Sequence, residues 1–191
     1  MFNLRPANIA EINAQRADFR GVSAVCPRIL APVHGLESSL PISFAHDRTR
    51  TCIDSGIRAF NAAKEAFANW KMFDLGWVHV ANLDARIIVG EVVVVEACTF
   101  GLWSLNISKI VEIIDSPTRF GFIYSTTESH VEFGEERFLI EIDSSTENVF
   151  YDIEAVSRPA HWAARLGLPI TRAFQHKFAR CSHRRLRELI T

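Results

Sequence analysis

The sequence lacks the features that would place it in a membrane or in a secretory pathway. Its longest apolar stretch, residues 87–95, is interrupted by Gly90 and Glu91 and is far shorter than the ~20 residues that a spanning helix needs. The N-terminal residues contain no apolar core of the length that a signal peptide requires. We therefore expect a soluble protein that is located in the cytoplasm.

The cysteines lack any metal-binding or redox spacing. Cys26, Cys52, Cys98 and Cys181 are scattered, with no C-x-x-C or C-x-x-H pair among them. This spacing gives neither a zinc knuckle nor a redox pair. We expect the four thiols to be reduced and mostly buried.

An excess of charge of either sign is also lacking. The chain has 21 Lys and Arg against 22 Asp and Glu residues, a net charge of -1. A protein that coats nucleic acid through bulk charge needs a large basic excess. No nucleic-acid partner is therefore expected.

The common motifs of nucleophiles and phosphate sites are absent. There is no G-x-S-x-G, P-loop or G-x-G-x-x-G sequence. His176 and His183 share one side of the predicted C-terminal helix, but no acidic residue or cysteine stands at a spacing that completes a metal site. We expect no cofactor and no metal ion, and ordinary surface or capping roles for the histidines.

The clearest pattern that is present is a β-hairpin between His130 and Pro159. Apolar residues alternate along two runs that are joined by the polar loop 144–147. If Asp143 pairs with Asn148 across this loop, every inward residue meets another one. The predicted pairs are Ile142 with Val149, Ile140 with Tyr151, Phe138 with Ile153 and, on the outer face, Arg137 with Glu154.

Glu136 is the polar residue on the apolar face of this hairpin. The register places it opposite Ala155, so its carboxylate should be shielded and must find a partner. The nearest candidates are Ser157 and Arg158, beyond the strand end. Two interpretations stay open, a structural clamp between Glu136 and Arg158, and a general base or polar anchor for a ligand.

The remaining periodicities predict an α+β chain. Residues 1–41 should form a short helix, from about Pro6 to Ala17, and an irregular arm that belong to one domain with residues 42–191. A polar edge strand at 42–50 and a helix at 57–72 with an apolar stripe follow. Strands are then expected at about 75–82, 87–98, 107–115, 119–127, 134–143 and 148–156, forming an antiparallel meander.

The end of the chain predicts a long amphipathic helix over 170–189. One side of this helix is basic, and we expect that side to face solvent. The alternative is that it contacts phosphate groups or anionic lipid. The apolar stripe consists of Ile170, Phe174, Phe178, Cys181, Leu186 and Leu189. We expect this stripe to pack along the concave side of the sheet.

Several runs, in order along the chain, carry a resemblance to a known family. They lie at residues 60–73, 101–106 (GLWSLN), 119–126 (RFGFIYST), 134–138 (GEERF) and 157–160 (SRPA). They closely resemble the domain-of-unknown-function family nineteen-ninety, the UPF zero-five-four-eight group of uncharacterised proteins, over about residues 41–179. Two loops depart from the family pattern, at residues 53–56 and at Ser125. The resemblance implies no established reaction.

The order of elements also looks like the helix-grip architecture of steroidogenic-acute-regulatory-type and polyketide-cyclase-like domains. This similarity implies a curved antiparallel sheet of about seven strands wrapped around the long C-terminal helix, often with a cavity between them. It is a fold-level analogy and assigns no specific function.

Three functions remain open at this point. The first is a binding module that holds a small apolar or amphipathic ligand between the sheet and the C-terminal helix. Its candidate ligand-binding residues are Glu136, Tyr124, Tyr151, Phe120, Phe122, Phe174 and Arg158. The second is a cyclase- or hydrolase-like enzyme with Glu136 or Tyr124 as acid or base. The third is a structural or interaction protein with a filled core, using Trp103, Trp162 or the basic helix face as a contact surface.

Overall fold

The computed structural model describes residues 2–21, 30, 44–127, 132–159 and 168–191. Its elements are β1 (Phe2–Asn3), α1 (Ile9–Arg20), β2 (Ala45–Ser55), α2 (Gly56–Ala68), the short 3-10 helix η1 (Lys71–Phe73), β3 (Val78–Val80), β4 (Val92–Thr99), β5 (Leu102–Ser116), β6 (Arg119–Thr126), β7 (Glu132–Ile142), β8 (Asn148–Pro159) and α4 (Leu168–Ile190). Most of the predicted irregular arm lies outside the described residues.

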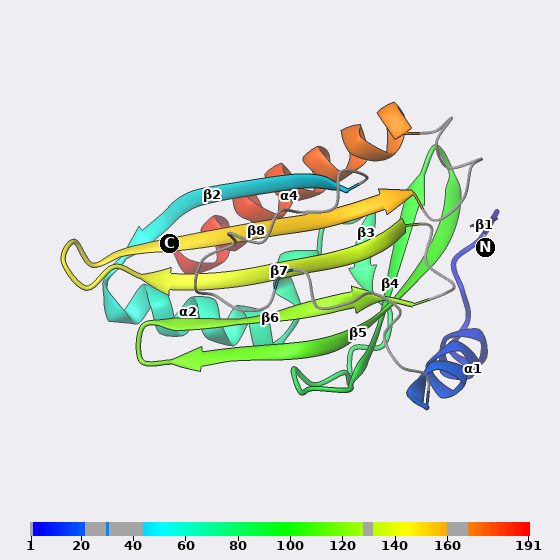
Figure 1. The fold of residues 1–191 in the computed structure, drawn as a ribbon, viewed down its shortest axis with the longest axis horizontal. Helices are drawn as coiled ribbons and strands as arrows, with labels where there is room; N and C mark the ends of the chain where they lie inside the picture. The colour runs from blue at the N-terminus through cyan, green and yellow to red at the C-terminus, as the bar shows by residue number, and fades with distance from the viewer. Residues whose placement is uncertain (1, 22–29, 31–43, 128–131, 160–167) are drawn as a thin grey trace.

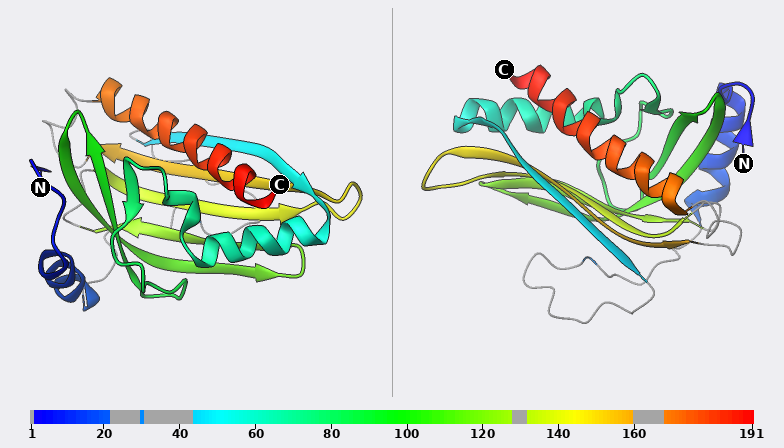
Figure 2. Two further views of the ribbon diagram at one scale, coloured as in Figure 1. Left: turned by 180° about the vertical axis from the view of Figure 1, so that it is seen from behind. Right: turned by 90° about the horizontal axis from the view of Figure 1, so that it is seen from above.

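The strands form one curved antiparallel sheet, with α2 and α4 on the same face (Figures 1 and 2). The strand order is β2-β8-β7-β6-β5-β4-β3, and the short β1 pairs with β5. The meander from β3 to β8 and the edge position of the polar strand β2 are confirmed. Because β2 pairs with β8, the last strand of the meander, the sheet brings residues 45–55 beside residues 148–157. The α+β helix-grip prediction, with a long C-terminal helix across the concave face, is correct.

The β7–β8 hairpin has the predicted register. Ile142 pairs with Val149, Ile140 with Tyr151, Phe138 with Ile153 and Arg137 with Glu154. In the loop, the Asp143 carboxylate accepts hydrogen bonds from the backbone N–H groups of Ser145 and Thr146. The hydrogen bond from the Ser145 hydroxyl, with these two backbone bonds, lowers the pKa of Asp143 to about 2. Asp143, the first residue after β7, therefore stabilises the turn with its own side chain, as the sequence predicts for a short polar connection.

Two glycines allow the strands of this region to bend closely over their neighbours. A Cβ atom on Gly121 would lie 2.1 Å from the carbonyl oxygen of Phe138, and one on Gly134 would lie 2.2 Å from that of Val156. No side chain fits in either position without moving the backbone of the adjacent strand. The curvature that encloses the concave face thus depends on glycine at these positions.

Helix α2 covers one end of the concave face with aromatic side chains. Phe60, Phe67 and Trp70 are buried, and the Phe67 ring lies 5.4 Å from that of Tyr151 and 6.2 Å from that of Phe122. The predicted helix of residues 57–72 is too long at its C-terminal end, because Trp70 adopts a left-handed conformation with φ of 55° before η1. Ile57, predicted to be in the stripe, is exposed in the first turn of the helix.

The buried side of α4 is rotated relative to the predicted stripe. Ala179, Ser182, His183 and Leu186 are buried, whereas Leu189 is exposed. The reason is tertiary, because α4 packs against β2 on one side and against α2 and η1 on the other. A helix that contacts several elements buries a wider face than the one defined by its most apolar residues.

The first helix and the cysteines also differ from expectation. Helix α1 starts at Ile9, because Asn8 and Glu11 form a reciprocal capping box at its N-terminus. It packs on β4 as a covering element.

Cys52, Cys98 and Cys181 are free thiols, but Cys52 on the edge strand is exposed and the other two are half-buried; Cys26 lies outside the described residues. No helix of the described chain is long and apolar enough to cross a membrane.

Candidate functional site

Inward-facing side chains become smaller along the strands, away from the end that α2 covers. On β8, Tyr151 and Ile153 are followed by Ala155 and Ser157 on the same face. On β7, Phe138 is followed by Glu136 and then by Gly134. Because α2 does not extend over this end, the shorter side chains leave space beneath the N-terminal half of α4. The result is a cavity of about 350 Å³ between the sheet and α4.

The cavity has mostly apolar walls with polar groups at a few points. Apolar walls come from Phe73, Trp77, Val78, Val95, Phe174 and Phe178. Polar groups in the lining include Tyr124 and Glu136, residues of β5, and residues of β2, β4, β7, β8 and α4; beyond Tyr124 and Glu136 they are Ser104, Asn106, Ser108, Asp47, Thr49, Thr99, Glu135, Ser157, Gln175 and His176. The Phe174 ring packs against Trp77 at a centroid distance of 5.8 Å and against Phe100 at 5.4 Å. The contact with Phe100 joins α4 to the turn between β4 and β5, and the contact with Trp77 joins it to the segment just before β3.

Tyr124 and Glu136 form a direct hydrogen bond in the wall of this cavity. They are paired residues on the neighbouring strands β6 and β7, and the Tyr124 hydroxyl donates to Oε2 of Glu136 at 2.5 Å. A hydrogen bond from a phenol to a carboxylate is charge-assisted and short. The two side chains therefore present one acid–base pair on the concave face.

The expected clamp between Glu136 and Arg158 is wrong. Glu136 pairs with Ala155, whereas Arg158 pairs with Phe133, and residues at positions 133 and 136 of one strand point to opposite faces. The guanidinium of Arg158 instead lies over the rings of Phe44 and Phe133, at 5.4 Å and 4.8 Å from their centroids. Arg158 thus belongs to the convex face and does not reach the cavity.

The other predicted site residues divide between the cavity and the packed core. Phe174 lines the cavity. Phe122 and Tyr151 are fully buried beneath α2, and Phe120 packs against Phe67 at 6.3 Å. These three face inward as expected, but they lie beneath α2 and are not among the described residues that line the cavity.

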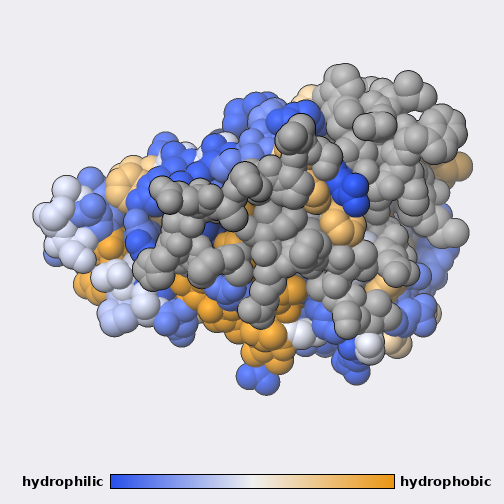
Figure 3. All heavy atoms as spheres, viewed as in Figure 1, coloured by the Kyte–Doolittle hydropathy of each residue, from blue (hydrophilic) through white to orange (hydrophobic). Residues whose placement is uncertain are grey.

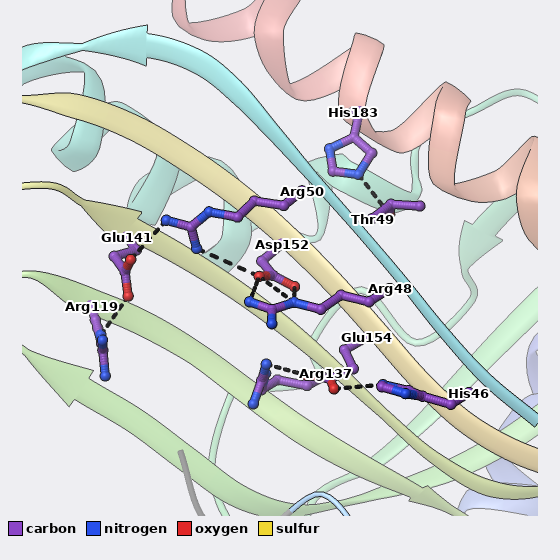
Figure 4. Close-up of polar contacts among 10 residues, drawn as sticks. All are labelled: His46, Arg48, Thr49, Arg50, Arg119, Arg137, Glu141, Asp152, Glu154 and His183. Atoms are coloured by element: carbon purple, nitrogen blue, oxygen red, sulfur yellow. Dashed lines mark hydrogen bonds and ion pairs between the residues drawn. The ribbon is translucent and has the colours of Figure 1, made fainter. Parts of the chain in front are cut away.

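Sequence reasoning missed a buried polar cluster between the sheet and α4. The Tyr151 hydroxyl hydrogen-bonds Ser182 at 2.9 Å, and Nε2 of His183 lies 3.0 Å from the Thr49 hydroxyl (Figure 4). Burial lowers the pKa of His183 to about 4, with Asp152 opposing and Arg187 reinforcing the shift. It also raises the pKa of Tyr151. The expected surface or capping role is therefore wrong for His183, because the buried side of α4 includes it.

A charged network crosses the opposite, convex face. Figure 4 shows Arg48 and Arg50 of β2 reaching toward Asp152 of β8, a fully buried carboxylate. Glu154 binds Arg137, the predicted cross-strand partner, and His46 at 2.7 Å. Hydrophilic residues gather along the β2 edge of this face (Figure 3).

The network extends to the neighbouring strands, where Glu141 binds Arg50 at 2.8 Å and Arg119 at 2.5 Å. Each carboxylate of the network is paired with at least one arginine. Because ion pairs link side chains of β2, β8, β7 and β6, we interpret the network as a fastening of the edge strand rather than as a reactive site.

The fold is a helix-grip α+β arrangement, an antiparallel sheet with a long C-terminal helix across its concave face. Solved structures share this fold at low sequence identity. The structure of Ara h 8.0201 matches with a TM-score of 0.52 at 12% identity, over 77% of this chain and 97% of the other. The di-domain ARO/CYC BexL matches with a TM-score of 0.53 at 15% identity, over 78% of this chain and 51% of the other.

A family model described as "Domain of unknown function (DUF1990)" matches residues 30–185, and the chain belongs to this family. Curated relatives named UPF0548 protein support the assignment. One from Dictyostelium discoideum is 35% identical over 147 residues, covering 71% of this chain and 68% of the relative. One from Arabidopsis thaliana is 31% identical over 170 residues, covering 86% and 80%. The resemblance found in the sequence is confirmed.

Proposed function

We propose that this protein binds a small amphipathic ligand in the cavity between the sheet and α4. The observation that carries the proposal is the cavity itself, whose volume of about 350 Å³ lies within the range of roughly 300–1,000 Å³ typical of small-molecule sites. Its apolar walls with a few convergent polar groups are also typical of such sites. A filled core, as in an interaction protein, would leave no such space.

In this proposal Tyr124, Glu136 and Phe174 contact the ligand directly. Tyr124 and Glu136 hold its polar end. Phe174 of α4, which packs against Trp77, covers its apolar part. Phe120, Phe122 and Tyr151 support the wall through the core beneath α2. Arg158, on the other face, takes no part in binding. A cytoplasmic location remains a prediction from the sequence.

The test is to fill the cavity from its floor. Ala155 lines the cavity, so Ala155→Phe should abolish the fluorescence increase of the neutral probe N-phenyl-1-naphthylamine that the unmodified protein gives. Ala68→Phe, on the exposed end of α2, is the matched control and should bind the probe normally. Failure of the unmodified protein to bind the probe, together with a bare-chain mass in native mass spectrometry of protein from its own host, would refute the proposal.

A second candidate, an enzyme with acid–base chemistry, is favoured by the hydrogen bond between Tyr124 and Glu136. A carboxylate in hydrogen-bond contact with a phenol inside a largely apolar cavity is suited to move a proton to or from a bound molecule. Native mass spectrometry separates the two functions. An enzyme whose Glu136→Gln variant is inactive would retain a molecule of different mass from that in the unmodified protein, whereas a binding protein would retain the same molecule or none.

A further inference from the structure

Strand β5 extends beyond its neighbour β4 and leaves part of its own edge open. It has 15 residues, whereas β4 has 8, and the ladder between the two strands ends at Lys109. Backbone hydrogen bonds between residues 90–91 and Ile110 continue the contact by one residue. From 112 to 116, β6 is the strand of the described chain that pairs with β5. In Figure 1 this part of β5 forms the lower border of the sheet.

The open edge directs the backbone groups of two residues away from the sheet. In an antiparallel pair, alternate residues exchange their N–H and C=O bonds with the partner strand, and the residues between them turn these groups to the other side. Ile110 uses both groups on the β4 side, and the register with β6 shifts by one residue between Ile110 and Glu112. After this bulge, Ile113 and Asp115 are the residues that turn to the open side. Within the described chain, no strand pairs with them there.

Apolar side chains lie on both faces of this edge and beside it. Ile113 and Ile114 are half-buried, and Ile88 and Val89, in the connection that contacts Ile110, are exposed. Figure 3 shows hydrophobic residues gathered along the same border. The border strand β2 on the other side of the sheet instead carries exposed charged or polar residues at alternate positions, as edges that avoid pairing do. An open edge with apolar flanks is a template for another strand.

The charges along the edge fit a second copy of the same edge in one register. If two β5 strands pair antiparallel about a twofold axis at Ile114, Ile113 of each copy lies opposite Asp115 of the other, and these residues exchange their outward backbone bonds. Glu112 then lies opposite Ser116, so no two carboxylates meet. Asp115 keeps its own ion pair with Lys64 at 3.3 Å. An axis at Asp115 would place two aspartates opposite each other, which is destabilising.

We infer that two copies of this chain associate edge to edge through residues 112–116 of β5, as a symmetric dimer whose twofold axis passes between the two Ile114 side chains. A twofold interface uses the same patch on both copies, so it closes both open edges at once. Ile88 and Val89 of one copy then meet the β5–β6 turn at Pro117 of the other, which adds apolar contact at each end. No residue of this edge lines the cavity, so the association is independent of the proposed function.

The first experiment measures mass in solution by sedimentation velocity over a dilution series. We expect twice the chain mass of 21.6 kDa. Ile114→Lys places two like charges beside the axis and should raise the concentration at which the dimer dissociates by roughly tenfold or more. Leu102→Lys makes the same change at an exposed residue of β5 whose edge β4 occupies, and it should leave the dimer intact. A single-chain mass at every concentration, or a dimer that Ile114→Lys does not weaken, would overturn the inference.

The second experiment tests the register and serves if Ile114→Lys does not fold. In Ile114→Cys, the two new thiols would face each other in a non-hydrogen-bonded pair with Cα atoms about 4.5 Å apart, which is within disulfide reach. Oxidation with copper-phenanthroline should give a linked dimer on a non-reducing gel, above the background that the exposed Cys52 of the unmodified protein sets. Ser116→Cys, on the same face, should give background only, because the two 116 positions lie on opposite sides of the axis. Background linkage in Ile114→Cys, or equal linkage in both variants, would contradict the interface.

Discussion

The side chain of His183 is neutral where it lies because the surrounding protein excludes water. It is buried between Tyr151, whose ring centroid is 4.7 Å away, and Thr49 on β2. An imidazolium in this position would lose its hydration, which is why its pKa is lowered to about 4. The negative Asp152 opposes this shift and the positive Arg187 adds to it, but burial is the largest cause.

This histidine should make stability depend on pH in a defined window. Its folded pKa lies below the unfolded value of 6.5, so the unfolded chain binds the proton first. The stability is present above pH 6.5 and is lost as the pH falls toward 4. At about 1.4 kcal/mol per pKa unit, the loss is on the order of 3 kcal/mol.

The measurement is urea unfolding at pH 7 and pH 4, compared between the unmodified protein and His183→Gln. The variant should lose about 3 kcal/mol less than the unmodified protein over this interval. His176→Gln, an exposed position on the same helix, is the control and should lose as much as the unmodified protein. An equal loss in all three proteins would show that His183 is not held neutral by burial.

At the scale of elements, α4 is fixed mainly by its C-terminal half. Leu186, in the C-terminal half, is completely buried in the main core, and Phe178, at the middle of the helix, packs 5.1 Å from Phe73. Phe174, nearer the N-terminal end, is half-buried and packs against Trp77 and Phe100 beside the cavity. The helix is thus anchored at one end and covers the cavity with the other.

This difference predicts unequal costs for two truncations in one helix. Leu186→Ala should lower the free energy of unfolding by about 3–5 kcal/mol, because it leaves a void in a packed region. Phe174→Ala should cost less, about 1–2 kcal/mol, because its ring is half-exposed and already borders a space. Chemical denaturation of both variants is the measurement. A larger cost for Phe174→Ala would mean that the N-terminal half of α4 anchors the helix.

The sequence predicts the elements to different degrees. The β7–β8 register follows from local alternation, because a slip by one residue would expose Phe138 and Ile140. The strand expected at 87–98 begins only at Val92, because the chain first turns at Gly90, whose φ is 90°. The buried face of α4 was not predictable either, because it depends on which elements surround the helix.

At the scale of the whole molecule, the concave face has a filled half and an open half. The filled half lies under α2, where Phe67 contacts Phe122 and Tyr151. The open half lies under the N-terminal part of α4, where Ala155, Ser157 and Gly134 line the cavity. The resemblance to helix-grip domains implied this layout in outline. The cavity itself depends on side-chain sizes compared across strands that are far apart in the sequence.

The two halves should therefore respond in opposite ways to the same substitution. Ala63→Phe, on the completely buried face of α2, adds a ring where there is no space and should cost about 1–3 kcal/mol or more through overpacking. Ala155→Phe adds the same ring at the cavity floor, where it fills space. Its stability should be unchanged or raised by about 0.5–2 kcal/mol, although probe binding is lost.

Thermal and urea unfolding of the two variants, beside the unmodified protein, test this contrast. If the cavity is open in solution, Ala155→Phe keeps or raises stability while it loses probe binding. The reason is that the unmodified protein retains empty volume for a ligand at a cost to its own packing. A loss of stability in Ala155→Phe as large as that in Ala63→Phe would show that the floor of the cavity is as tightly packed as the core under α2. The protein would then have a filled core, and the case for a bound ligand would fail with the cavity.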